Sequence, residues 1–501
     1  MKFSKLWVLL LAASFTIMSC GDDDSPEEMV VTTDDDGGMT DDGDNGMSEL
    51  LAAQEMTTAN LTNDGSGKVW RIEQATLNNE SGAIDISSNF NVVDDEFIFS
   101  GSRTNGSLEW RQGNAIGVDG TSSQETLLDF YKAPVMSSFS FDAESSTNLS
   151  GLDGNMTFQV IDENTITGQL SFTEGRRAGE TLDFDLTTKT SEDYAAPQTD
   201  LQFSNFAVLF NDCVSSCAPG FAGSYADNSL FVSTRAAVNN NNSELVVKYN
   251  AETGTEESFL FPQADFVSKQ LLVRDDQLVI VGGQYVNRYD LDDLNNPTSE
   301  LHGKALTRFG TAVQGDILYI IGGGLDNVDP EKIFQYNLET GQLSDFVSLP
   351  EPRFGARGTI VNNKLYVFGG TTTFGGSDAM NTLYIIDIAT QQITTETMPV
   401  SLNYSYVERF QNLIYVAGRI DLRNDEGNNT GRDEFIGVYD TRDGSWTELT
   451  TNLTGTQDDF VSIHGMGLFN NRLYIIYDDG LDDDNNPDTP SPNNILVADL
   501  N

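Results

Sequence analysis

The sequence Lys-Leu-Tyr-Val-Phe-Gly-Gly at residues 364–370 is the pattern around which the second half of the chain is built. It is a short apolar run that ends abruptly in two glycines. Near-copies and weaker copies occur at Asp316–Gly323, Gln277–Gly283, Asn412–Gly418, Arg472–Tyr477 and Ser229–Ser233. Six related strands, spaced about 40–60 residues apart, predict a repeat architecture.

Each repeat has the same internal order, which predicts four short antiparallel strands. A start such as Arg353-Phe-Gly leads into an apolar strand, and a turn such as Asn362-Asn363 joins it to the strand that ends in Gly-Gly. A third strand carries a Tyr-Asn or Tyr-Asp pattern that ends in glycine, as in Gln335–Gly341, and a closing strand such as Ser445–Leu449 follows. Units of this kind form the blades of a β-propeller.

The sequence also indicates how the ring of blades closes. The sixth unit stops at Asn494–Asn501, which corresponds to a third strand, so its outermost strand has to come from elsewhere. An alternating run at Asp200–Phe210 precedes the first unit. We expect this run to pair there and close the ring, so that truncation before about residue 212 destabilises the domain.

A hydrophobic strand that ends in Gly-Gly, followed by Tyr-Asp and a downstream tryptophan, resembles the kelch repeat. The resemblance covers residues 197–501 and is strongest in the units with Gly322-Gly323 and Gly369-Gly370, while Trp446 alone keeps the kelch tryptophan. WD repeats would show Gly-His and Trp-Asp, which these units lack. The resemblance implies an all-β fold with a six-bladed kelch-type β-propeller.

Residues 65–195 predict a second β domain, because apolar and polar residues alternate in about eight short runs separated by Gly, Asn, Asp and Ser turns. Such a pattern is typical of a small antiparallel barrel or sandwich. The sequence Gly-Lys-Val-Trp-Arg-Ile at residues 67–72 resembles the first strand of lipocalin-like domains of Bacteroidetes lipoproteins. That resemblance implies a barrel able to hold a small apolar ligand. The alternative is a packed accessory barrel with Trp70 in its core.

Residues 1–19 predict a lipoprotein signal peptide: Lys2 and Lys5 precede an apolar run too short to span a membrane. Cys20, after Ile-Met-Ser, resembles a lipidated cysteine; the alternative is an ordinary signal peptide. Residues 20–64 predict an acidic flexible tether with a short helix over 48–60. The sequence Ser-Cys-Gly-Asp-Asp-Asp resembles the start of Bacteroidetes lipoproteins, which implies a lipid-anchored protein of the outer membrane, on its periplasmic or cell-surface side.

The charge and the cysteines narrow the function classes. With 77 acidic and 27 basic residues and a formal net charge of −50, the chain would repel nucleic acid. If Cys20 is acylated, Cys213 and Cys217 remain as a pair that predicts a local disulfide in an oxidising compartment. Metal binding by this pair would need two further ligands, and the chain contains two histidines.

In a four-stranded blade, the loop between strands two and three lies on the same face as the start of the innermost strand. The residues that we place near the innermost-strand starts, and predict to contact a ligand, are Arg308, Arg353, Tyr404, Tyr406 and His464. Such side chains suit a carboxylated or hydroxyl-rich ligand such as a sugar. The alternative is that the arginines tie adjacent blades together. Asp478, Asp482 and Asp484 form a candidate calcium site, against the alternative of a solvated acidic loop.

These observations favour a lipid-anchored envelope protein whose propeller recognises a glycan or a protein partner without catalysis and with no cofactor other than calcium. The alternative is a carbohydrate-active enzyme of the sugar epimerase or lyase type at the propeller mouth. Galactose oxidase has kelch-like blades, but its copper site needs histidines, and two in the whole chain argue against it. Sialic-acid epimerases match the blade count, yet no motif here carries over their acid and base.

Overall fold

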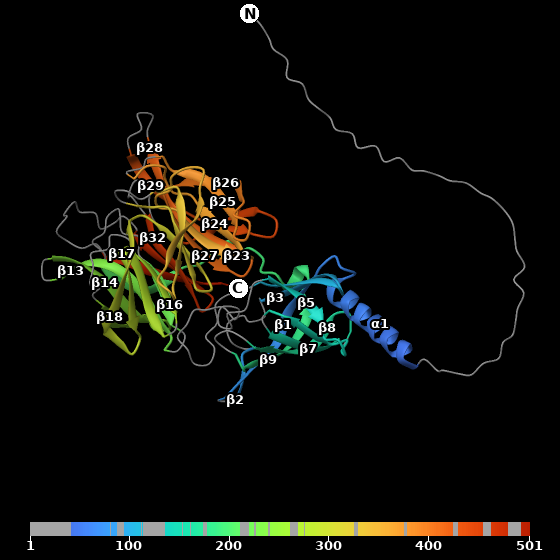
Figure 1. The fold of residues 1–501 in the computed structure, drawn as a ribbon. Coiled ribbons are helices and arrows are strands. Elements are labelled where there is room, and N and C mark those ends of the chain that lie inside the picture. The colour runs from blue at the N-terminus through green and yellow to red at the C-terminus, as the bar shows by residue number, and fades with distance from the viewer. Residues whose placement is uncertain are drawn as a thin grey trace, which may run out of the picture. The chain divides into compact units, whose positions relative to one another are not determined.

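The structure is a computed structural model, and it describes residues 42–500 except for 81, 88–94, 112, 114–135, 153, 161, 174–177, 211–219, 225–226, 239–240, 261–268, 275, 325–328, 375–377, 424–428, 454–461 and 479–491. The strands form one closed barrel and a ring of separate small sheets (Figure 1). Among the described residues, no helix is both long enough and apolar enough to cross a membrane.

The first β domain is a barrel in which each strand pairs with the next, and the first pairs with the last. Its strands are β1 (Lys68–Asn79), β3 (Glu96–Ser102), β4 (Asn105–Arg111), β5 (Met136–Phe141), β6 (Asn148–Gly151), β7 (Gly154–Val160), β8 (Thr165–Phe172) and β9 (Thr181–Thr188). Antiparallel pairing of β1 with β9 closes the ring, and β2 (Gly82–Asp85) adds to the far end of β1. Of the two predicted architectures, barrel and sandwich, the barrel is confirmed.

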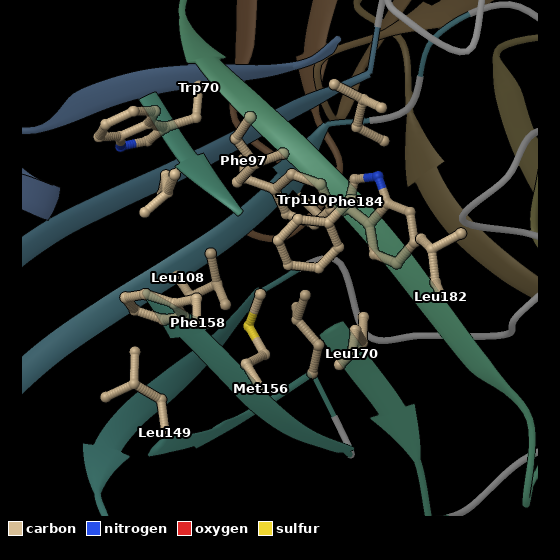
Figure 2. Packing of buried hydrophobic residues seen from close by; sticks show 14 of the residues in the cluster. Trp70, Phe97, Leu108, Trp110, Leu149, Met156, Phe158, Leu170, Leu182 and Phe184 are labelled. Atoms are coloured by element: carbon tan, nitrogen blue, oxygen red, sulfur yellow. The ribbon is translucent and has the colours of Figure 1, made fainter. Parts of the chain in front are cut away.

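The barrel interior is filled by its own side chains (Figure 2). The rings of Phe97 and Trp110 lie 4.9 Å apart, and those of Phe97 and Phe184 lie 5.9 Å apart. Trp70 is fully buried, and its indole Nε1 donates a hydrogen bond to the Leu61 carbonyl at 3.0 Å. This packing fits the alternative in which Trp70 belongs to a packed core.

The helix before the barrel is longer than predicted, and its second half contacts the barrel. Helix α1 runs from Asp42 to Thr62, whereas the sequence predicted a helix over 48–60 within a flexible segment. Leu61 is buried in the barrel core, and Gln54 Nε2 donates to the carbonyls of Asp142 and Ser145 at 3.2 and 2.8 Å. These contacts attach the second half of the helix to the barrel. A 3₁₀ turn at Ser191–Asp193 follows the barrel.

The propeller consists of six sheets that follow one another along the chain. Blade 1 contains β12 (Phe221–Ser224), β13 (Ser229–Val238), β14 (Asn241–Asn250) and β15 (Glu256–Leu260). Blade 2 contains β16 (Gln270–Arg274), β17 (Gln277–Asp290) and β18 (Asp293–Leu306). Blade 3 contains β19 (Gly310–Gln314), β20 (Ile317–Ile321), β21 (Lys332–Asn337) and β22 (Leu343–Ser348).

Blade 4 contains β23 (Arg357–Val361), β24 (Lys364–Phe368), β25 (Met380–Asp387) and β26 (Ile393–Leu402). Blade 5 contains β27 (Tyr404–Phe410), β28 (Leu413–Arg423), β29 (Asn429–Asp440) and β30 (Ser445–Glu448). Blade 6 contains β32 (Ser462–Phe469), β33 (Arg472–Asp478), β34 (Pro492–Asp499) and, from before blade 1, β11 (Ser204–Phe210). The short strands β10 (Asp200–Leu201) and β31 (Thr450–Thr451) form a parallel pair. The predicted all-β, six-bladed fold is confirmed.

In blade 2 the single strand β17 takes the place of the second and third strands of the neighbouring blades. The Leu291 N–H donates a hydrogen bond to the Asp276 carbonyl at 3.0 Å. The equivalent hydrogen bond in blade 3 runs from the Leu338 N–H to the Asp316 carbonyl at 2.8 Å. An extended strand rises about 3.3 Å per residue, so Asp276 and Leu291 could not form a hydrogen bond if β17 were one straight strand. β17 therefore folds back on itself near Gly283, whose φ is 54°.

β11 pairs antiparallel with β34, from Ser204 opposite Val497 to Phe210 opposite Pro492. This is the segment that we expected to close the ring, and its partner strand is in blade 6. Blade 6 and blade 1 share an apolar cluster in which Leu230 and Val232 pack with Tyr474 and Ile476. The ends of the propeller segment are thus held in one blade.

Candidate functional site

The first strand residue of blade 5 lies at the centre of a group of cations and rings. Two guanidinium groups lie near the Tyr404 ring, with the Cζ of Arg308 5.5 Å and the Cζ of Arg419 5.1 Å from its centroid. Together with Phe374 and Asp421, these residues form what we call the Arg–Tyr cluster. They come from blade 3, the β24–β25 loop of blade 4, and blade 5.

Arg308 is held in a conformation that few residues other than glycine adopt. Its φ is 52°, and its carbonyl accepts a hydrogen bond from the Gly355 N–H at 2.7 Å. Its Cζ lies 4.5 Å from the Phe374 ring centroid, and its Nη1 donates to the Phe374 carbonyl. Because non-glycine residues with positive φ concentrate at functional sites, this backbone geometry supports a binding role.

Phe374 presents an aromatic face to solvent. Its side chain is 43% exposed, and its ring packs edge-on against Phe354 at 5.8 Å. An exposed ring that is oriented by a buried one, and that lies beside a guanidinium group, offers an apolar face next to a cation.

The Arg–Tyr cluster carries two cations and one carboxylate. Asp421 Oδ1 lies 2.9 Å from Arg419 Nε, and Asp421 Oδ2 accepts a hydrogen bond from Asn403 Nδ2 at 2.8 Å. Burial raises the pKa of Tyr404, although Arg308 and Arg419 oppose this shift. The phenol is therefore protonated at neutral pH and can donate a hydrogen bond. On a chain of net charge −50, this local excess of positive charge suits an acidic or hydroxyl-rich ligand.

Arg353, which we predicted to contact a ligand, is completely buried. Its Nη2 donates to Glu351 Oε1 at 3.0 Å, and its Cζ lies 4.7 Å from the Tyr384 ring centroid. Its carbonyl also accepts from the Gly323 N–H at 2.7 Å. The guanidinium group thus contacts blade 4 and the segment that leads into it, and the backbone carbonyl links this segment to blade 3.

Tyr406 is also a packing residue rather than a ligand contact. It is 6% exposed and belongs to the apolar cluster between blades 5 and 6, with Ile463 and Met466. Burial raises its pKa to about 12. Tyr404 and Tyr406 lie on the same strand, but the second of them is enclosed by the next blade.

His464 and Asp478, which we predicted for two different sites, are neighbours. His464 Nε2 lies 3.5 Å from Asp478 Oδ2, and His464 is the extra residue of a bulge between β32 and β33. His464 is 9% exposed. Asp482 and Asp484 lie outside the described residues, and so do Cys20, Cys213 and Cys217. Among the described residues, no group of three or more His, Cys, Asp and Glu side chains could hold a metal ion.

The sequence did not lead us to Phe374, Arg419 and Asp421. The sequence predicts a loop over residues 419–433, but β28 and β29 continue to the pair Arg423 and Asn429. Arg419 and Asp421 therefore lie two residues apart on one strand and share a face. The alternation in Ala-Gly-Arg-Ile-Asp-Leu at residues 417–422 is the signal that could have shown this.

Comparisons with known proteins agree with this architecture. A kelch motif model matches residues 352–392, which include the stretch 364–370. Kelch-like protein terF of Aspergillus terreus is 25% identical over 227 residues, which cover 41% of this chain and 49% of that protein. The chain thus spans about half the length of this curated relative. A solved structure titled "Structure of YjhT" is 12% identical with a TM-score of 0.41, and the match covers 57% of this chain and 95% of that one.

The matched motif, the kelch-like relative and the six blades support a kelch β-propeller. A propeller of kelch repeats suggests a non-catalytic role in binding or recognition.

Proposed function

We propose that the propeller recognises a glycan without catalysis and that the Arg–Tyr cluster is its contact surface. The observation that supports this proposal is that Arg308 and Arg419 both lie near the Tyr404 ring, while Arg308 also lies over the exposed ring of Phe374. Guanidinium groups present paired donors to carboxylates and hydroxyls, and aromatic faces stack on the apolar face of a sugar ring. A glycan that carries carboxylates satisfies both features.

The experiment is a titration of the purified protein with soluble polyuronates and with neutral polysaccharides. Arg308→Ala and Tyr404→Ala each remove part of the cluster, and we expect each to weaken binding roughly tenfold or more. Arg472→Ala is the matched control, because this propeller arginine pairs with the exposed Asp499 at 3.0 Å, away from the cluster. If all polysaccharides bind the three variants and the original chain equally, or none binds at all, the glycan proposal fails.

We also propose that Cys20 carries a lipid that anchors the protein in the outer membrane. The support is the short apolar run that ends at Ser19-Cys20 and the acidic segment that follows. Replacement Cys20→Ser should release the protein from the membrane fraction. Retention of this variant in membranes would contradict the anchor and would leave the glycan proposal untouched.

One half-buried residue provides a test of the enzyme alternative. Glu408 lies in the innermost strand β27, and burial raises the pKa of its carboxyl to about 8. A carboxyl that stays protonated at neutral pH can act as a general acid. Turnover of an acidic sugar that disappears in Glu408→Gln, with binding retained, would replace the non-catalytic proposal with this one.

A further inference from the structure

A cavity of about 310 Å³ lies between the second half of α1 and the turn from β3 to β4. The helix contributes Glu55, Thr58, Ala59 and Thr62, which share one helical face, and the remaining walls are Asp64–Gly65 and Gly101–Thr104. The volume corresponds to about ten water molecules and lies at the lower end of the range for small-molecule sites. The cavity is separate from the Arg–Tyr cluster and from the filled barrel interior.

The walls of this cavity are fixed by the barrel. Leu61 anchors the helix in the core, and the Gly101 N–H donates to the Gly65 carbonyl at 3.1 Å, which joins the helix end to the strand turn. A side chain at Gly101 would place its Cβ 2.3 Å from the Asn105 carbonyl oxygen, so only glycine fits at this position. The cavity wall at Gly101 therefore consists of backbone atoms. Sites built on rigid elements bind without a large cost of ordering.

Arg103 brings hydrogen-bond donors to the wall of the cavity. Its Nη1 lies 3.4 Å from Gln54 Oε1, and its buried Nε has no hydrogen-bond partner among the residues that the structure describes. Because the Nε is closed off from the cavity, it cannot meet a ligand there. The guanidinium group carries five N–H donors, however, so Arg103 keeps donors for a ligand beyond its contact with Gln54.

The other polar groups define the ligand class. The Thr58 and Thr62 hydroxyls donate to carbonyls one turn earlier at 2.8 and 2.7 Å, so they are already engaged. Glu55 and Asp64, both exposed, line the same cavity as Arg103 and add carboxylate acceptors. Hydroxyl groups both donate and accept, and two carboxylates against one guanidinium disfavour an anion. We propose that this cavity binds a neutral, hydroxyl-rich ligand of the size of one monosaccharide.

The test is ligand-observed saturation-transfer NMR on the purified protein with glucose, galactose, mannose and inositol, and with glucuronate as the charged comparison. We expect transfer to at least one neutral probe and a roughly tenfold or greater loss of affinity in Arg103→Met. Ala59→Leu fills the cavity without changing its charge and should abolish the transfer. Melting temperatures show whether each variant is folded.

Three outcomes would overturn the inference: no transfer to any neutral probe at about 20 mM, transfer unchanged in Ala59→Leu, or stronger binding of glucuronate than of the neutral sugars. Arg308→Ala should leave the transfer unchanged. Loss of the signal in that variant would assign it to the propeller and not to the cavity. The cavity inference and the glycan proposal therefore fail separately.

Discussion

Two arginines in the same sequence motif differ in burial and in neighbours in this propeller. Arg308 and Arg353 each precede Phe-Gly before an innermost strand, yet Arg308 is half-buried beside two rings and Arg353 is completely buried. The difference lies in the neighbours. Glu351 and Tyr384 surround the guanidinium group of Arg353, whereas Phe374 and Tyr404 line that of Arg308. A motif therefore locates the start of a blade, and the side chains that pack around its cation decide whether the cation can meet a ligand.

The first glycine of the Gly-Gly pair should not tolerate a side chain equally in every blade. Gly322 and Gly369 have φ values of 55° and 57°, so alanine strains the backbone at both. A Cβ at Gly322 would lie 2.2 Å from the Arg353 carbonyl oxygen, whereas a Cβ at Gly369 meets its nearest atom, the Leu402 carbonyl oxygen, at 3.2 Å. We expect Gly322→Ala to lower the free energy of unfolding by about 2–4 kcal/mol and Gly369→Ala by about 1 kcal/mol. Urea unfolding measures both, and equal losses would contradict the clash argument.

His302 should make the protein less stable in acid. It is 5% exposed, and burial lowers its pKa from 6.5 to about 4. Its Nδ1 accepts from the Lys304 N–H at 3.3 Å, while its buried Nε2 has no hydrogen-bond partner within the part of the chain that the structure describes. Between about pH 6.5 and pH 4 the unfolded chain binds the proton more readily than the folded one, so stability falls as the pH falls through this window.

This effect of His302 should lower the free energy of unfolding by about 2–3 kcal/mol near pH 4, and it should be absent above about pH 7. His302→Gln should remove it, so the difference in melting temperature between the variant and the original chain should change between pH 7.5 and pH 4.5 in favour of the variant. A difference that stays constant over this range would contradict the prediction.

At the scale of strands, a tyrosine of the third strand bonds to a glutamate that precedes its blade. Tyr336 donates to Glu300 Oε2 at 2.7 Å, Tyr384 to Glu351 Oε1 at 2.9 Å, and Tyr439 to Glu396 Oε2 at 2.8 Å. Each bond joins successive repeats. Burial raises the pKa of Tyr336 and of Tyr384 to about 12, so these phenols keep the proton that they donate. Tyr336 and Tyr439 belong to the Tyr-Asn and Tyr-Asp pattern of the repeat, which thus includes a link between blades, whereas Tyr384 lies two residues before the equivalent pair Ile386-Asp387.

Tyr439→Phe should break one such link without disturbing the packing of the ring. The Tyr439 side chain is 2% exposed, and phenylalanine keeps all of its apolar atoms. Loss of a hydrogen bond to a charged acceptor should lower the free energy of unfolding by about 1–2 kcal/mol. Urea unfolding is the measurement, and Glu396→Gln, which keeps an acceptor but removes the charge, should cost less. A larger loss in Glu396→Gln would show that the hydrogen bond is not the stabilising contact.

At the scale of the whole propeller, stability depends on the strand that joins its two ends. β11 comes before blade 1 but is the fourth strand of blade 6. Leu209 on this strand is 1% exposed and packs in the cluster between blades 6 and 1, while the adjacent Val208 is 49% exposed. Successive residues of a strand face opposite sides, which explains the contrast.

Leu209→Asp should therefore destabilise the propeller by several kcal/mol, because it buries an unpaired charge at the closure of the ring. Val208→Asp is the matched control, and we expect a change of about 0.5 kcal/mol or less. Calorimetric unfolding of the full chain distinguishes the two variants. Equal stability of the two variants would show that β11 does not hold the ring closed.

The local patterns of this chain were enough to predict six blades, the strands within them and a barrel or sandwich before them. Apolar runs of strand length, alternation and the glycine pair are properties of neighbouring residues, so they can be seen without coordinates. The candidate site was predictable in part: Arg308 and Tyr404 lie in it, while Arg353 and Tyr406 are buried between blades. Exposure of these side chains depends on residues such as Tyr384 and Ile463 in other strands or blades. Tertiary structure alone brings Arg419 to Tyr404 and Glu396 to Tyr439, because packing between strands and between blades creates these contacts.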